Sequence, residues 1–340
     1  MTEPCFNPAV ANLSSYYLMS CVLNVYLEPT SCILGLLLNL FALYVFAKVL
    51  LLQWWRYCAR KRILIHYLIA LCIFDCLQLL LGLLVIVMPA AEQFVRPVDQ
   101  RLANGPLHTL NVYTVRMLYP LLMASSYASV WTLATACVQR YVEVCLPRST
   151  RSWWHCVRRS KRTISVVCLL ALGVNLIRYA EMQWVRRNGT VILNSTALRR
   201  HPTYQAVTDV LHSSVTYLGP LVLLTILNVR IVKAIGRQKE LRQRFRARST
   251  HVQLLFRKHE TQEYRNALMI LAVILLFFGC RTLSLGLRVG IRHVYTMLYD
   301  QDLPPNHPLV FVQDLSNYLV ITSSAINPQS QTARKEPSHF

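Results

Sequence analysis

The chain has 340 residues, of which 54% are hydrophobic and only 15% are charged, and it carries 36 Lys or Arg against 15 Asp or Glu. Soluble domains have about a quarter of their residues charged, so this composition argues against a soluble globular protein. The basic residues are divided among segments between long apolar runs and do not form one domain, which argues against nucleic-acid binding.

Seven apolar runs are long enough to cross a bilayer as a helix, which takes roughly 20 residues. In chain order they are Cys21–Leu52, Ile63–Pro89, Val112–Cys145, Thr163–Gln183, Ala206–Ile235, Arg265–Val289 and Leu309–Pro328. We therefore predict an all-α membrane protein with a seven-transmembrane helix bundle over residues 21–328, an extracellular arm over 1–20 and a polar cytoplasmic tail over 329–340. No basic segment precedes the first run, so we expect this run to insert without a cleaved signal peptide.

Basic residues gather in alternate segments between the runs, over 56–62, 148–162 and 230–258, whereas the arm has none. Cytoplasmic loops carry an excess of Lys and Arg. We therefore place these segments inside and the N-terminus outside, with the protein spanning the plasma membrane. The basic face of 230–258 suits either a cytoplasmic protein partner or anionic membrane lipid.

Three glycosylation sequons, at Asn12, Asn188 and Asn194, all fall on the predicted outer side. Of the 11 cysteines, Cys5 and Cys21 are the two that we expect outside the membrane, where they could form a bridge. No CxxC pair or His/Cys ligand spacing is present, so we predict no metal site.

Polar residues recur inside the apolar runs, where they are costly and mark functional sites by default. In order they are Asn39, Leu68 to Asp75, Gln139-Arg140-Tyr141 with Pro147, Pro220, Phe277 to Cys280, and Asn327-Pro328. This ordered set resembles the rhodopsin-like, or class A, G-protein-coupled receptors, and the resemblance extends to Pro328. It implies signalling to a heterotrimeric G protein.

A narrower set of motifs resembles the invertebrate and nematode FMRFamide-type neuropeptide receptors. It consists of Tyr119-Pro120, Ser129-Val-Trp131, Asn175-Leu-Ile-Arg178-Tyr-Ala-Glu181 and Leu315-Ser-Asn317, with Ile177 where that group has proline. The resemblance implies an extracellular FMRFamide-like peptide as ligand.

By resemblance, Arg140 is the cytoplasmic switch, together with its neighbours Gln139 and Tyr141 and with Asn327-Pro328. An acidic neighbour holds this arginine in the resting state of the family, whereas here the neighbour is Gln139. A neutral amide holds a guanidinium less tightly than a carboxylate does. We therefore expect raised signalling without ligand.

The resemblance also implies an allosteric sodium ion in a polar cluster of Asn39, Asp75, Ser129, Ser324 and Asn327. Span six argues against the ion, because Arg281 and Leu283 stand where the family has tryptophan and proline. A buried arginine needs a partner. Arg281 could pair with Asp75 in place of sodium, or turn outward to meet an acidic group of the ligand, and we predict no other cofactor.

Candidate ligand-binding residues lie in the outer halves of the spans: Glu28, Arg116, Tyr119, Arg178, Glu181, His212, Arg281 and Asp314. A ligand ending in Arg-Phe-amide would need a carboxylate for its guanidinium, and Glu181 and Asp314 are the candidates. Arg178 and Glu181 could equally pair with each other as i,i+3 neighbours. The family's disulfide between helix three and the second extracellular loop is missing, since Val115 replaces one cysteine and 182–204 contain none.

The tail departs from the family, because Gln331 stands at the NPxxY tyrosine and Glu336-Pro337 opposes a further helix. We expect truncation or alternative splicing after Pro328. A non-signalling isoform that acts as a partner or decoy is therefore an alternative. A transporter is a further alternative, but it predicts internal repeats with broken helices, and none is evident. No phosphate loop or catalytic triad is present, so we predict no enzymatic activity and no catalytic residues.

Overall fold

The computed structural model describes residues 15–52, 59–95, 105–145, 157–187, 190–245, 279 and 308–326. The predicted sixth span, apart from Gly279, lies outside these residues. So do the predicted site residues Asn12, Asn188, Arg281, Asn327 and Pro328.

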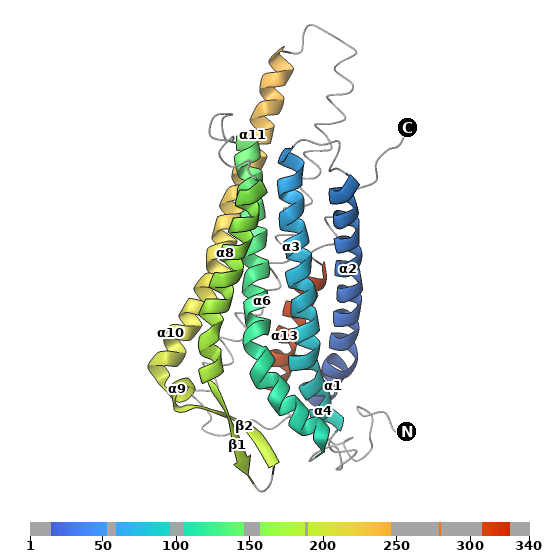
Figure 1. Ribbon diagram of the computed structural model, residues 1–340, viewed down its shortest axis with the longest axis vertical. Helices are drawn as coiled ribbons and strands as arrows, with labels where there is room; N and C mark the ends of the chain where they lie inside the picture. The colour runs from blue at the N-terminus through green and yellow to red at the C-terminus, as the bar shows by residue number, and fades with distance from the viewer. Residues whose placement is uncertain are drawn as a thin grey trace.

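Helices correspond to six of the seven predicted spans and run side by side as a bundle (Figure 1). The first span comprises α1 (Ser15–Val22), η3 (Leu23–Leu27) and α2 (Glu28–Leu52), and the second comprises α3 (Ala59–Gly82), η4 (Leu83–Val87) and α4 (Met88–Val95). The third is α6 (Pro106–Cys145), and the fourth comprises α8 (Val157–Leu176) and η5 (Ile177–Ala180). The fifth comprises α10 (Pro202–Ser213), η6 (Ser214–Leu218) and α11 (Gly219–Phe245), and the seventh is α13 (Pro308–Ile326).

Prolines explain the π-helical turns within these helices. Each turn ends two residues before a proline: η3 before Pro29, η4 before Pro89 and η6 before Pro220. Proline has no N–H and its ring clashes with the carbonyl four residues earlier, so a regular α-helical turn cannot continue unchanged. A π turn widens the helix at that point, and the first helix therefore continues through Glu28-Pro29.

A β-hairpin follows the fourth helix. Strands β1 (Met182–Arg187) and β2 (Thr190–Ser195) pair antiparallel with Met182 opposite Ser195, and the short helix α9 (Ala197–Arg200) comes next. The predicted fourth span is wrong at its end, because Met182 and Gln183 belong to β1 and not to a helix. The hairpin, α1, α4 and α9 lie at one end of the bundle, here called the hairpin end, and α11 projects at the other (Figure 1).

Helix α6 supplies much of the core, since it contacts α3, α8 and α11. Val130 of α6 and Leu224 of α11 are fully buried in one apolar cluster with Leu71 of α3. Large apolar side chains of α2 point outward instead; Leu34 and Phe41 are each 60% exposed. Such a surface suits lipid and not water.

Four helical stretches within the described residues are long and apolar enough to cross a membrane. They are Ser15–Leu51, Ile63–Glu92, Pro106–Val142 and Ser160–Ala180. These stretches correspond to the first four predicted spans.

Candidate functional site

Buried polar residues connect four helices in the middle of the bundle. The Ser129 hydroxyl donates a hydrogen bond of 2.6 Å to a carboxylate oxygen of Asp75, which joins α6 to α3. The Asn39 amide donates to the Ser324 carbonyl at 3.3 Å, which joins α2 to α13. All four residues are fully buried. The structure thus brings four members of the predicted polar cluster together as two pairs, and Asn327 lies outside the described residues.

Close contact between α2 and α13 makes the Asn39 bond possible. A Cβ atom added to Gly35 would lie 2.6 Å from the Cβ atom of Ala325, so only glycine fits at this position. Asn39 also donates to the Gly35 carbonyl at 2.8 Å, which fixes its side chain on its own helix.

Three of the predicted switch residues, Gln139, Arg140 and Tyr141, lie near the C-terminal end of α6. Gln139 is buried, and the Nε atom of Arg140 is buried without a hydrogen-bond partner. Tyr141 packs against the apolar cluster that contains Val130. Among the described residues, the Nε atom of Arg140 thus has no carboxylate partner.

Glu181, a predicted ligand residue, is engaged by other residues of the chain. Its side chain is buried where η5 meets β1, and it accepts hydrogen bonds from Tyr204 of α10 at 3.0 Å and Arg199 of α9 at 3.5 Å. Arg178 lies 3.8 Å from the same carboxylate, so the i,i+3 pair that we considered is present.

Arg178 is also held by its neighbours. Its Nε atom donates to the Asn175 side chain at 2.9 Å, and its guanidinium reaches the Tyr119 hydroxyl at 3.5 Å. Glu181, Arg178 and Tyr119 therefore form one network that fixes the end of helix four against α6, α9 and α10. Tyr204 and Arg199 were not predicted, because neither belongs to a motif.

The hairpin is attached to helix three by an aromatic contact. The guanidinium of Arg116 lies over the Trp184 ring, 4.1 Å from its centroid, and the Tyr113 ring centroid lies 4.8 Å from that of Trp184. The Tyr179 hydroxyl donates to the Met117 carbonyl at 3.0 Å. These contacts join α6 to the hairpin and η5 close to Val115, the position at which the family that the sequence resembles has a disulfide cysteine.

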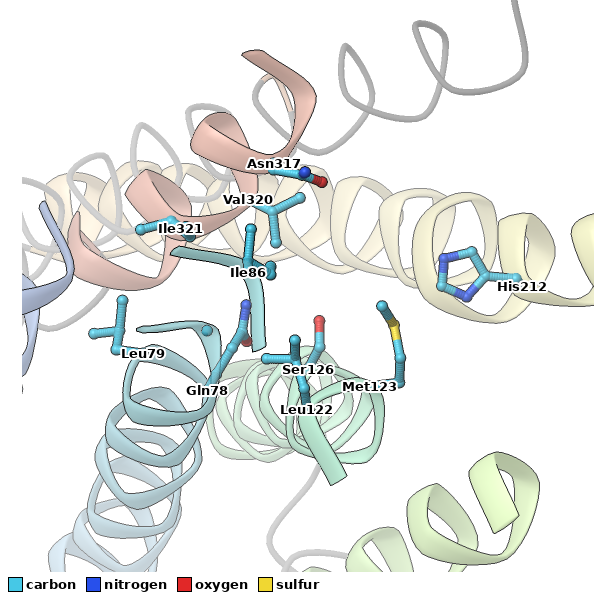
Figure 2. Close-up of a pocket in the computed structure, with 11 residues that line it drawn as sticks. Gln78, Leu79, Ile86, Leu122, Met123, Ser126, His212, Asn317, Val320 and Ile321 are labelled. Carbon is cyan, nitrogen blue, oxygen red and sulfur yellow. The ribbon is translucent and has the colours of Figure 1, made fainter. Parts of the chain in front are cut away.

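A pocket lies between α3, η4, α6, α10 and α13, with about 500 Å³ of empty volume that includes space open to the surroundings. Figure 2 shows Gln78, Ser126, His212 and Asn317 as the polar side chains among mostly apolar neighbours. Few polar groups in an apolar wall are typical of ligand sites. His212 is the predicted ligand residue that lines this pocket, and it is hydrogen-bonded to the Tyr127 hydroxyl.

The remaining described candidates for ligand binding, Glu28 and Asp314, lie on the first and seventh helices, where α13 packs against α1, η3 and α2. Glu28 is fully buried, and Asp314 accepts a hydrogen bond from the Ser20 hydroxyl. Cys21 is disulfide-bonded, and its partner lies outside the described residues. The sequon residue Asn194 is on β2, where its side-chain oxygen accepts from Arg200 at 3.0 Å.

Comparison with known proteins agrees with this arrangement. The family model of the seven-transmembrane receptors (rhodopsin family) matches residues 61–329. The chain is 23% identical over 261 residues to the FMRFamide peptide receptor frpr-18 of Caenorhabditis elegans, which covers 75% of this chain and 55% of that protein. It is 27% identical over 219 residues to the FMRFamide receptor of Drosophila melanogaster, which covers 62% of this chain and 35% of that protein.

The chain thus matches about half the length, or less, of these two relatives. The family match covers most of the chain and includes the Asp75–Ser129 pair, the predicted switch and the pocket. It also covers the predicted sixth span. The chain therefore belongs to the rhodopsin family of seven-transmembrane receptors, which are multi-pass membrane proteins and not enzymes.

Proposed function

We propose that this receptor binds an extracellular FMRFamide-like neuropeptide and passes the signal to a heterotrimeric G protein. The observation that carries the proposal is the pocket between α3, η4, α6, α10 and α13 (Figure 2). Its apolar wall suits the phenylalanine side chains of such a peptide, and its few polar groups suit a terminal amide. The names of both relatives support this choice of ligand.

The proposal also includes an orientation, with the hairpin end outside the cell. This orientation is supported by the basic segments at the other end, where α11 carries Arg230, Lys233 and Arg237. A peptide would then enter the pocket from the side of the hairpin, and the G protein would meet the end that contains Arg140.

A cell-based activation assay tests the ligand. Cells expressing the full chain should respond to Phe-Met-Arg-Phe-amide with a calcium or cAMP signal, and the free-acid form of the peptide should be weaker. Ser126→Trp would fill the pocket and should abolish the response at unchanged surface expression, because Ser126 faces the open space. Leu169→Trp, on the outward face of α8, is the matched control and should respond normally. Full activation of Ser126→Trp would refute the pocket as the peptide site.

A further inference from the structure

The described residues include three buried glutamates, Glu28, Glu92 and Glu181. Glu92 is paired with His108 at 3.0 Å and with Asn111 at 2.6 Å. Glu181 accepts from Tyr204 and lies close to two arginines. Glu28 differs from both, because neither of its carboxylate oxygens has a hydrogen-bond partner in the part of the chain that the structure describes. A buried carboxylate is normally paired or hydrogen-bonded, so this one is an exception that needs an explanation.

Glu28 also has a second acid nearby, which makes the lack of a partner harder to explain. Asp314 of α13 is close enough for its charge to act on Glu28, and α13 packs against both α1 and η3. Two carboxylates that share a buried site repel each other. Among the described residues, no Lys, Arg or His lies within ion-pair distance of either carboxylate. Within these residues, two acids between the first and seventh helices therefore have no cationic partner.

The two acids differ in access. Glu28 is fully buried, whereas Asp314 is only partly buried and accepts a hydrogen bond from Ser20. Ser20 lies in α1, about two turns nearer the hairpin end than Glu28. A group that approaches from the hairpin end would thus meet Asp314 first and Glu28 behind it.

We infer that Glu28 and Asp314 together form the receptor's subsite for a cationic group of its ligand, a guanidinium above all. A guanidinium offers five N–H donors in a fixed plane, which suits a buried carboxylate without a donor that has a second acid nearby. The identity of the ligand rests on the proposed function, but the charge of the subsite does not. The inference also replaces Glu181 as the partner of the ligand's arginine, because Glu181 is already engaged.

The test uses purified full-length receptor in lipid nanodiscs and two small probes. Acetyl-Arg-Phe-amide carries the guanidinium, and acetyl-citrulline-Phe-amide replaces it with a neutral urea of the same shape. We expect the arginine probe, and not the citrulline probe, to raise the unfolding temperature of the wild-type receptor. Glu28→Gln should abolish this difference, and Asp314→Asn should reduce it. Glu92→Gln, which changes a buried glutamate that already has partners, should retain it.

A cell assay with full peptides separates this inference from the proposed function. Replacing arginine by citrulline in Phe-Met-Arg-Phe-amide should weaken activation of the wild-type receptor about 10- to 100-fold, as expected for the loss of hydrogen bonds to charged groups. The same replacement should have little effect on Glu28→Gln. If Glu28→Gln showed the wild-type ratio, the subsite would be refuted while the peptide function stood.

The opposite result is also informative. If Phe-Met-Arg-Phe-amide failed to activate the receptor but the arginine probe still stabilised the wild type and not Glu28→Gln, the subsite would stand and the proposed ligand would fall. Absence of any stabilisation by the arginine probe would overturn the subsite. Misfolding of Glu28→Gln is not expected, because glutamine has nearly the same size and the substitution removes a buried acid that has no hydrogen-bond partner among the described residues. Its unfolding temperature without probe checks this directly.

Discussion

Single carboxylates show how far residue types alone can indicate function. Both Glu181 and Asp314 were reasonable partners for a ligand's arginine from sequence, since each lies at the outer end of a span. The structure gives Glu181 three partners, Tyr204, Arg199 and Arg178. Two of these come from segments 18 and 23 residues away, so no local pattern could reveal them.

Removing the Glu181 charge should destabilise the receptor. In Glu181→Gln, Arg178 and Arg199 lose their carboxylate, and breaking a buried ion pair leaves a charge without compensation. We expect a loss of about 3 kcal/mol in the free energy of unfolding, measured as lower thermal stability in nanodiscs. Arg186→Gln, an exposed change on β1, serves as the control. Unchanged stability of Glu181→Gln would show that the network does not hold the end of helix four.

The switch arginine allows a test of resting activity. Arg140 has a buried Nε atom without a partner, and its neighbour is the neutral Gln139. Gln139→Glu should supply a charge-assisted hydrogen bond, roughly twice as strong as a neutral one, and lower ligand-free signalling several-fold. Nucleotide exchange on the G protein without peptide measures this. Gln139→Met is the uncharged control of similar size, and equal resting signals from all three receptors would contradict the proposed role.

The sequence predicted the positions of the helices better than it predicted their internal detail or the hairpin. Apolar runs located the spans, because crossing a bilayer demands about 20 such residues. The π turns before Pro29, Pro89 and Pro220 could not be read from apolarity, since they are local responses to proline. The hairpin was missed as well, because the fourth apolar run continues past Ala180 into β1.

The aromatic contact on the hairpin should stabilise it in place of a disulfide. Arg116→Met keeps the apolar stem but removes the cation over Trp184, which lies 4.1 Å away. A desolvated cation–π pair contributes about 2 kcal/mol, so amide exchange in 182–195 should accelerate about 30-fold. Arg186→Met, on the exposed face of β1, is the matched control. Equal exchange in both variants would show that the hairpin is held by other contacts.

Gly35, at the contact between α2 and α13, allows a test of how closely these two helices pack. Gly35→Ala would place its Cβ atom 2.6 Å from that of Ala325, so the helices must separate and the Asn39–Ser324 bond must lengthen. Overpacking of this kind costs about 1–3 kcal/mol. Gly173→Ala in α8 meets no atom within 4 Å and should be neutral or stabilising, because alanine favours helices. The two unfolding temperatures decide the matter, and equal values would refute the close contact.

At the scale of the whole molecule, the membrane explains both what the sequence could predict and what it could not. The seven-helix fold class followed from seven apolar runs and ordered polar motifs, and the family match confirms it. The outward apolar side chains of α2 fit a lipid environment. Pairing between helices, such as Glu28 with Asp314, depends on how each helix is rotated in the bundle, and hydropathy carries no such information.

Orientation in the membrane is a property of the whole molecule that Asn194 can report. The sequon Asn194-Ser195-Thr196 lies at the hairpin end, and Arg200 bonds the side-chain oxygen of Asn194, which leaves the nitrogen available for a glycan. If the hairpin end is outside, Asn194 should be glycosylated. In a receptor that also carries Asn12→Gln and Asn188→Gln, a glycosidase should increase electrophoretic mobility by one step. Thr196→Ser should preserve that step and Thr196→Ala should remove it.

Identical mobility of the Thr196→Ser and Thr196→Ala variants before digestion would mean either that the hairpin end is on the cytoplasmic side or that the sequon is unused. Labelling of a cysteine introduced at the exposed Gln183, with a reagent that cannot cross the membrane, distinguishes these two results, because only an external hairpin reacts in intact cells.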